Sequence, residues 1–296
     1  MRLLECKDNN EFSLTKDLIN NIPAYTILFH MWGDDDREVT YEDLMEGLGK
    51  SKARYQKIRF CGEQATRDGI RYFWVDTCCI NKTNAVKLQK SINSMFRWYR
   101  HAVKCYVYLS DVSIPNDFYL NLESVFQTAR WFTRGWTLQE LLAPSSVESF
   151  SADYKRIGDK VSLERLIHKR TGILIVALRG YDPTQFSVDE RVSWVAKRDT
   201  KHEEDMAYSL LGIFDIFLPL IYGEGRENAF RRLREEVSKR YDFNKLPKSG
   251  VEDHSKFTVP FVRDPKFVGR EDIIQEIANR LEIQRRVALC GIGGIG

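Results

Sequence analysis

Three short apolar runs alternate with helical stretches in the first half of the chain, and this alternation restricts the possible folds more than any other feature. The runs cover 24–29, 72–80 and 104–112, where aromatic and β-branched residues dominate, as is typical of strands covered on both faces. Helical periodicity over 51–68 and 85–101 separates them. Strands joined in this way pair in parallel, with helices on both faces of the sheet. The sequence therefore predicts an α/β fold with an open parallel sheet.

The second half of the chain shows mainly helical periodicity. Apolar or amphipathic stretches predict helices over 161–170, 185–197, 203–218 and 226–241. A polar stretch that contains proline and glycine follows and is typical of a linker. We therefore divide the chain into an α/β core over 1–155, a helical extension over 156–243, a linker over 244–265 and a further segment over 266–296.

The final segment has the pattern with which a phosphate-binding loop begins. A predicted strand over 286–290 runs into a glycine-rich turn, which contains Gly291, Gly293, Gly294 and Gly296. The lysine and the serine or threonine that complete such a loop are not among the residues of this chain. Backbone N–H groups alone hold a nucleotide weakly, so we expect no tight binding of GTP or ATP here.

Composition argues against several classes of function. A net charge of +3 over 296 residues is too balanced to indicate binding to nucleic acid or to a membrane surface. No apolar run approaches the ~20 residues of a membrane-spanning helix, and the first residues lack the apolar core of a signal peptide. The six cysteines form no CxxC pair, and the five histidines do not fall at metal-ligand spacing. We expect a cytoplasmic protein with reduced thiols and no metal.

One candidate catalytic residue lies in the segment 131–144. The centre of this segment, 136–142, predicts a short helix that Pro144 ends. Trp136 and Glu140 are four residues apart and share one face of this helix. A carboxylate beside an indole is partly desolvated, which raises its pKa and suits it to acid–base or electrostatic work. Spacing alone favours the simpler interpretation, a surface glutamate on an ordinary amphipathic helix.

Polar residues at the predicted strand ends are candidate binding residues. Trp32, Gly33 and Asp34 lie in the loop after the first strand, and such loops bind ligands in open α/β sheets. The alternative is an exposed acidic turn. Asp76 interrupts the second apolar run, so it is either buried and hydrogen-bonded within the strand or placed at the strand's end near a site. The sequence leaves both pairs of alternatives open.

Five segments resemble the fungal heterokaryon-incompatibility (HET) domain, and the resemblance covers residues 1–243. They are ILFHMWG (27–33), WVDTCCINK (74–82), SINSMFRWYRHAVKCYVYLSDV (91–112), RGWTLQELLAP (134–144) and AYSLLGIFDIFLPLIYGEG (207–225). The final segment resembles the beginning of a NACHT NTPase domain of STAND receptors, in which an effector precedes a nucleotide switch. The resemblance implies an effector that triggers cell death on self-association, in response to an unlinked triggering protein. GTP or ATP would then belong to a full-length parent.

The chain departs from the HET pattern at three positions. Phe29 and Met31 stand where the pattern has Ser and Thr, and Asn81 stands where it has Asp. Because Phe29 falls at a strand end, we expect an aromatic ring there to narrow a pocket or weaken an activity.

A second and more distant resemblance is to TIR domains, which have a flavodoxin-like parallel sheet. The loop with Trp32, Gly33 and Asp34 and the helix with Trp136 and Glu140 occur in the same order in those domains. The resemblance implies NAD+ as a possible substrate and Glu140 as the catalytic carboxylate, which stabilises an oxocarbenium-like centre. The loop residues, Trp136 and Asp76 would then bind the substrate.

The alternative function is a non-enzymatic adaptor that self-associates through helix faces. Arg97, Trp98 and Arg100 are of the types that dominate protein interfaces. Core or solvated positions remain the simpler interpretation for these three residues.

Overall fold

The computed structural model describes residues 1–7, 11–34, 36–114, 123–124, 126–180, 182 and 185–241. The chain divides into two compact units, Met1–Asp242 and Phe243–Gly296. The predicted linker and the glycine-rich turn with Gly291, Gly293, Gly294 and Gly296 lie outside the described residues.

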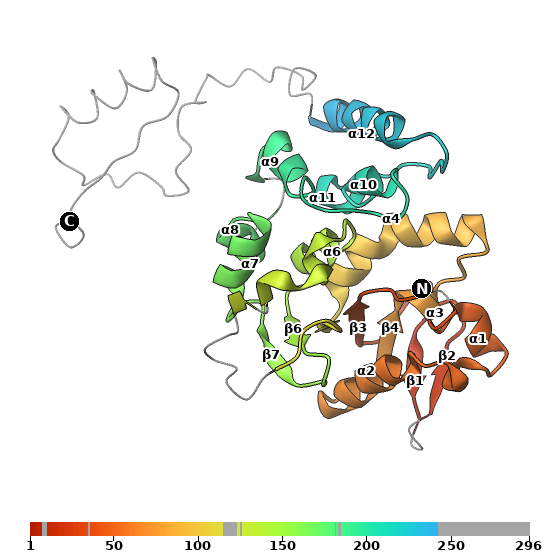
Figure 1. Cartoon of the computed structure of the whole chain (residues 1–296). Coiled ribbons are helices and arrows are strands. Elements are labelled where there is room, and N and C mark those ends of the chain that lie inside the picture. Colours follow the sequence, from red (N-terminus) through yellow and green to blue (C-terminus); the bar gives the residue numbers. More distant parts are fainter. Residues whose placement is uncertain are drawn as a thin grey trace, which may run out of the picture. The chain divides into compact units, whose positions relative to one another are not determined.

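Seven strands form one sheet in the order β2-β1-β4-β3-β5-β6-β7 (Figure 1). The central strands β4, β3, β5 and β6 are parallel, whereas β1, β2 and β7 pair antiparallel at the edges. The prediction of an open α/β sheet is confirmed, and its parallel pairing holds at the centre. The edge strands were missed because three or four residues are too few to show an alternating pattern. The bounds are β1 Leu4–Cys6, β2 Phe12–Leu14, β3 Tyr25–His30, β4 Tyr72–Val75, β5 Lys104–Tyr108, β6 Val147–Phe150 and β7 Arg156–Asp159.

The order of the strands defines where a ligand can enter. Strand β3 pairs with β4 on one side and with β5 on the other, so that Ile27 lies opposite both Trp74 and Cys105. The chain therefore passes from β3 to β4 and then returns across β3 to reach β5. In open α/β sheets, ligands bind outside the carboxyl ends of the strands at such a reversal.

Helices cover both faces of the sheet. Figure 1 shows α2 on one side, α4 and α6 on the other, and α10, α11 and α12 stacked beyond α4. Alternate residues of β4 face the two layers: Phe73 packs on Phe12 beside α2, whereas Trp74 packs on Trp98 of α4. The bounds are α1 Tyr41–Met45, η1 Gly49–Ser51, α2 Tyr55–Arg67, α3 Asp76–Cys79, α4 Ala85–His101, η2 Arg130–Thr133, α6 Thr137–Leu142, α7 Glu164–Thr171, α8 Ile175–Leu178, α9 Val188–Ser193, α10 Asp205–Tyr208, α11 Leu211–Phe214 and α12 Arg226–Tyr241.

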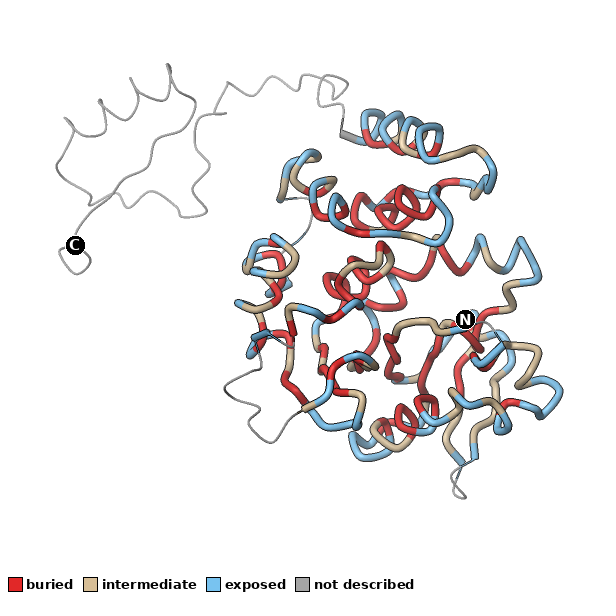
Figure 2. Tube along the Cα trace, in the orientation of Figure 1, coloured by how far each residue is buried: buried red, intermediate tan, exposed pale blue. Residues whose placement is uncertain are grey.

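Burial follows these layers. Figure 2 shows buried backbone through the central strands and through α6, α10 and α11, whereas one side of α12 is exposed. Trp98, which the adaptor interpretation placed at an interface, is only 7% exposed because it packs on Trp74, so that placement is wrong. Arg97 and Arg100 on the same helix are exposed. Among the described residues, no helix combines the length and the apolar character needed to cross a bilayer.

Two predicted elements are shorter than the sequence suggested. The apolar run 72–80 is a strand only as far as Val75, which is the last residue of β4 in register with β3; Asp76 then begins the single-turn helix α3. The stretch 203–218 is two short helices, α10 and α11, and left-handed backbone at Asp215 ends the second. An apolar composition predicted burial correctly in both stretches, but it did not predict these breaks.

Candidate functional site

A cavity of about 1130 Å³ lies at the carboxyl ends of β3 and β4, at the reversal of strand order. Five parts of the chain line it: the loop 30–34, the segment 76–82, the inner face of α4, the segment 130–140 and the segment 199–222. All of the described candidate residues, which are Trp32, Gly33, Asp34, Asp76, Trp136 and Glu140, line this one cavity. The expectation that the loop after the first strand faces a potential binding site therefore agrees with the fold.

Glu140 is buried at the wall of the cavity. Only 9% of it is exposed, and every residue of α6 is buried, so the interpretation as a surface glutamate is wrong. Its Oε2 accepts a hydrogen bond from the indole N–H of Trp131 at 3.0 Å. Burial, with the nearby carboxylate of Asp76, raises the pKa of Glu140 to about 8.

The tryptophan that bonds Glu140 is not the one that helical spacing suggested. Trp136 caps the start of α6 and lines the cavity, but the hydrogen bond to Glu140 comes from Trp131 in the turn η2. The i, i+4 spacing does bring Trp136 and Glu140 to the same cavity, but the indole that bonds the carboxyl group comes from η2, which packs against α6. No spacing rule links residues 131 and 140 across such a turn.

Asp76 lies at the end of its strand and faces the cavity. The indole N–H of Trp32 donates to its Oδ2 at 2.6 Å, which fixes both side chains at the base of the cavity. The Nζ of Lys82 lies 3.4 Å from the centre of the Trp32 ring, and the guanidinium of Arg134 lies 5.7 Å from it. Of the two alternatives for Asp76, the strand-end position is therefore the correct one.

A buried charged cluster supports the loop 30–34. Oε1 of Glu38 accepts hydrogen bonds from the Nζ of Lys57 at 2.7 Å and from the backbone N–H of Gly33 at 2.8 Å. Oε2 of Glu38 forms an ion pair with the same Nζ at 2.5 Å. The Nε2 of His30 lies 3.9 Å from both Glu38 and Asp76. Burial and the positive charge of Lys57 hold the pKa of His30 well below its ordinary value, so its imidazole is neutral. Neither ring nitrogen of His30 has a hydrogen-bond partner among the described residues.

The helical extension holds α6 in place. The buried guanidinium of Arg198 donates to Thr137 Oγ1 at 2.6 Å and to the carbonyl of Arg134 at 2.9 Å. Gln139 donates to the carbonyl of Ser209 at 2.7 Å. These bonds attach the helix that carries Glu140 to a part of the chain about 60 to 70 residues further on.

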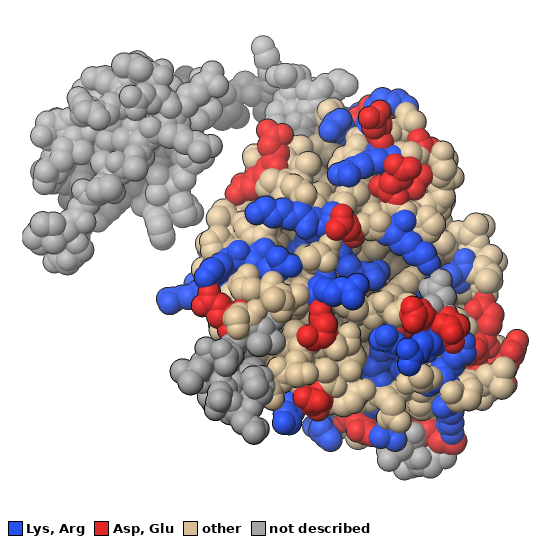
Figure 3. All heavy atoms as spheres, in the orientation of Figure 1, with Lys and Arg blue, Asp and Glu red and all other residues tan. Residues whose placement is uncertain are grey.

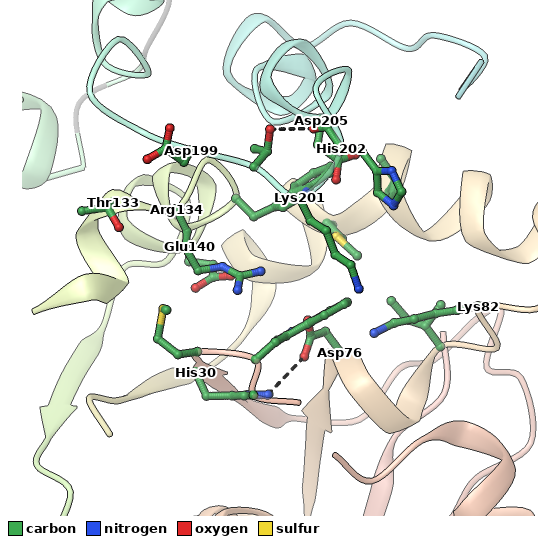
Figure 4. Close-up of a pocket in the computed structure, with 18 of the residues that line it drawn as sticks. His30, Asp76, Lys82, Thr133, Arg134, Glu140, Asp199, Lys201, His202 and Asp205 are labelled. Atoms are coloured by element: carbon green, nitrogen blue, oxygen red, sulfur yellow. Dashed lines mark hydrogen bonds and ion pairs between the residues drawn. The ribbon is translucent and has the colours of Figure 1, made fainter. Parts of the chain in front are cut away.

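The same extension also supplies one wall of the cavity (Figure 4), which the sequence did not predict. The signal available was the charged run 198–205, which stands between two apolar stretches. The residues it contributes are Asp199, Thr200, Lys201, His202, Asp205 and Tyr222.

Of the three departures from the HET pattern, only Met31 lines the cavity. Phe29 is buried and packs edge-to-face on Tyr99, with ring centres 5.0 Å apart, so its ring does not narrow the cavity, and its effect on an activity stays a prediction. The cavity is lined by the next residues, His30 and Met31. The side chain of Asn81 accepts hydrogen bonds from Thr83 and from the backbone of Asn84, which an aspartate can also do.

Comparison with known proteins agrees with the resemblance. Residues 25–120 match the family described as "Heterokaryon incompatibility protein (HET)". The chain is 58% identical over 243 residues to "Vegetative incompatibility protein HET-E-1" of Podospora anserina. The chain carries a HET domain. That alignment covers 81% of the chain but only 18% of the relative, and no solved structure matches.

The family match covers one side of the cavity only. It spans β3, β4 and β5 with the loop 30–34 and Asp76, and it ends before Glu140 and the extension. In the described part of the chain, no group of three or more histidine, cysteine or acidic side chains comes together as a metal site. Among the described residues, the cavity of this HET domain is therefore lined by five carboxyl groups, two tryptophans and four Lys or Arg side chains.

Proposed function

We propose that this HET domain is an effector of vegetative incompatibility and that it acts by cleaving NAD+. The incompatibility role is supported by the HET match and by the name of the relative. The observation that carries the proposed chemistry is the buried Glu140 carboxyl group at the wall of a cavity of about 1130 Å³, at the reversal of strand order. This volume accommodates a ligand as large as a dinucleotide.

The proposed reaction needs one carboxylate. The bond between C1′ of the ribose and the nicotinamide nitrogen breaks, and its electron pair neutralises the pyridinium. Positive charge then develops on the ribose, and an ionised Glu140 at the buried wall of the cavity stabilises it. A water molecule attacks C1′ and releases its proton to solvent, which gives nicotinamide and ADP-ribose.

The remaining residues bind and position the substrate. Trp131 donates to Oε2 of Glu140 and so directs its carboxyl group toward the cavity. Trp32 and Trp136 provide aromatic walls, and Asp76 holds Trp32 by its indole N–H. Gly33 leaves room for the guanidinium of Arg54, because a Cβ at this position would overlap that group.

Activation is proposed to follow self-association, with an incompatibility partner as the trigger and cell death as the outcome. Control by GTP or ATP would belong to a longer parent protein, in keeping with a relative of which this chain spans 18%.

The test is an assay of the purified chain with NAD+ at several protein concentrations. Nicotinamide release is expected from the wild type, and Glu140→Gln is expected to reduce it on the order of 10²–10³-fold. Glu235→Gln is the matched control, because Glu235 is an exposed residue of α12 outside the cavity. Equal release by the wild type and Glu140→Gln would reject the proposal. Toxicity without NAD+ loss would instead favour the adaptor function.

A further inference from the structure

Tyr222 is an aromatic residue at the wall that the extension supplies to the cavity. Figure 4 shows this wall, with His202 and Asp205, across the cavity from His30 and Asp76. The Tyr222 ring packs beside the ring of His202, with ring centres 5.1 Å apart, and Tyr222 is 41% exposed. Of the Trp and Tyr side chains that line the described cavity, it is the most exposed, so part of its ring is accessible to a ligand.

The backbone on both sides of Tyr222 is fixed by hydrogen bonds. The N–H of Ile221 donates to the hydroxyl of Tyr208 at 2.9 Å, and the N–H of Gly223 donates to the carboxylate of Glu204 at 2.8 Å. Gly223 has a φ of 94°, which glycine adopts without strain. Because Tyr222 lies between two bonded neighbours, a ligand that packs on it loses little free energy in ordering the chain.

The side chain of Tyr222 is held as well, by a buried carboxyl group. Its hydroxyl donates to Oδ1 of Asp205 at 3.0 Å, and Asp205 is only 7% exposed. Burial raises the pKa of Asp205, and interactions with the side chains of Trp136 and Tyr222 offset part of that rise. The carboxyl group of Asp205 therefore lies beside two aromatic side chains of the cavity, one at the start of α6 and one in the extension.

Apolar side chains line the part of the cavity next to this wall. Leu88, Ile92 and Met95 contribute them from the inner face of α4. Asn93 on the same helix accepts a hydrogen bond from the backbone N–H of Leu218 at 3.1 Å and donates one to its carbonyl at 3.1 Å. These bonds hold the chain that leads to Tyr222 alongside α4. Apolar and aromatic side chains with a few placed polar groups are typical of sites that bind flat organic ligands.

Charge, in contrast, does not single out one position for a ligand. Five carboxyl groups and four Lys or Arg side chains line the described cavity, and Figure 3 shows charged side chains of both signs spread over one face of the molecule. The accessible aromatic surface is concentrated at Tyr222 and Trp136. Nucleotide bases stack on such side chains because every base has a π-face.

We infer that Tyr222 is the stacking residue of a subsite for the planar heteroaromatic base of a nucleotide, and that Asp205 is the positioning residue that orients it. The identity of the nucleotide rests on the proposed function. NAD+ carries two such bases, adenine and nicotinamide, and the stacking chemistry is the same for both. The subsite decides which compounds bind and takes no part in breaking the bond to nicotinamide.

The first experiment measures binding without cleavage, in the full chain that carries Glu140→Gln. AMP is the probe for adenine, nicotinamide mononucleotide is the probe for nicotinamide, and ribose 5-phosphate is the probe without a base. Adding Tyr222→Leu is expected to raise the Kd of AMP or of nicotinamide mononucleotide about tenfold, as measured by NMR titration. The probe that loses affinity identifies the stacked base, and the Kd of ribose 5-phosphate is expected to stay unchanged.

Phe217→Leu is the matched control for this experiment. Phe217 is an aromatic residue of the same segment and is 65% exposed, but it does not line the cavity. The subsite is overturned if neither nucleotide binds, if Tyr222→Leu binds both as the parent does, or if it loses affinity for ribose 5-phosphate to the same extent.

The second experiment tests the role of Asp205 with NAD+ as substrate and an otherwise wild-type chain. Tyr222→Leu is expected to raise KM about tenfold with little change in kcat, because stacking stabilises substrate and transition state alike. Tyr222→Phe keeps the ring but loses the bond to Asp205, so a rise in KM of roughly threefold is expected. Asp205→Asn, which keeps an acceptor for the hydroxyl, is expected to retain the wild-type KM.

Asp205→Ala is expected to match Tyr222→Phe, and the two changes together are expected to raise KM no further. Additive rises would mean that Asp205 does not act through Tyr222.

The two experiments also separate the subsite from the proposed reaction. If base binding depends on Tyr222 but the wild type releases no nicotinamide, the reaction is refuted and the subsite stands. If the wild type and Tyr222→Leu cleave NAD+ with the same KM, the subsite is overturned and the reaction stands.

Discussion

The two sides of the cavity are built by different means. On the sheet side, the loop 30–34 and Asp76 are placed directly by the ends of parallel strands, and the buried pair of Glu38 and Lys57 supports them. On the other side, the extension reaches the cavity through irregular chain between α9 and α10. Hydrogen bonds from Arg198 and from Gln139 attach it to α6.

This difference shows what each side contributes. The sheet side is a local consequence of strand order, so a ligand site at this edge follows from topology alone. The extension side depends on contacts over about 60 to 70 residues, and it fixes the helix that carries Glu140. Variants that weaken one side at a time therefore test the two sides separately. A variant on the sheet side tests the support of the loop 30–34, and a variant on the extension side tests the support of the Glu140 carboxyl group.

The largest effect is expected from Lys57→Met on the sheet side. This change leaves the buried Glu38 without its closest cation, and breaking a buried ion pair in this way costs about 3–5 kcal/mol of the free energy of unfolding. Urea denaturation measures the loss. The double variant Glu38→Gln/Lys57→Met is expected to recover most of it. A loss below about 1 kcal/mol would mean that the cluster does not support the loop.

A smaller effect is expected from Arg198→Met on the extension side. The acceptors on Thr137, Arg134 and Trp194 lose their donor, but the cost of burying the guanidinium charge also disappears. We expect a loss of roughly 2–3 kcal/mol. Hydrogen exchange is expected to rise in α6 more than in β3. Arg156→Met, at an exposed position of β7, is the control, and equal exchange in both elements would contradict the role of Arg198.

The smallest and most selective effect is expected from Glu140→Gln as pH changes. The folded protein holds the pKa of Glu140 at about 8, above its ordinary value of 4.5. The native state therefore binds the extra proton between these values, and the wild type loses stability as pH rises through this window. As pH rises from 5 to 7, the free energy of unfolding of the variant is expected to increase by on the order of 2 kcal/mol relative to that of the wild type.

Catalysis is expected to change with pH in the opposite direction. The kcat/KM for NAD+ is predicted to rise toward pH 8 as Glu140 ionises in the free enzyme.

Matching stability of the wild type and the Glu140→Gln variant at all pH values would show that Glu140 is not buried as a neutral acid. Urea denaturation across the pH range, with Glu235→Gln alongside, makes this measurement.

The sequence predicted the core of the fold better than it predicted the cavity. Sequence patterns identified β3 and α4 because every residue of β3 is buried and α4 buries one regular face. It identified the loop with Trp32 and the residue Asp76 because strand ends are local features. It missed Trp131, Arg134 and Lys201, whose positions depend on a turn and on the return of the extension, and neither leaves a periodic pattern.

The wall formed by the extension also has a consequence for protein synthesis. Residues 199–205 and Tyr222 complete the cavity, so a chain that is still emerging from the ribosome has made the sheet long before it has an enclosed pocket. The proposed reaction needs the complete cavity, so we expect it to begin only after Tyr222 has been translated. A premature stop codon anywhere before Tyr222 would likewise leave a sheet without a complete site.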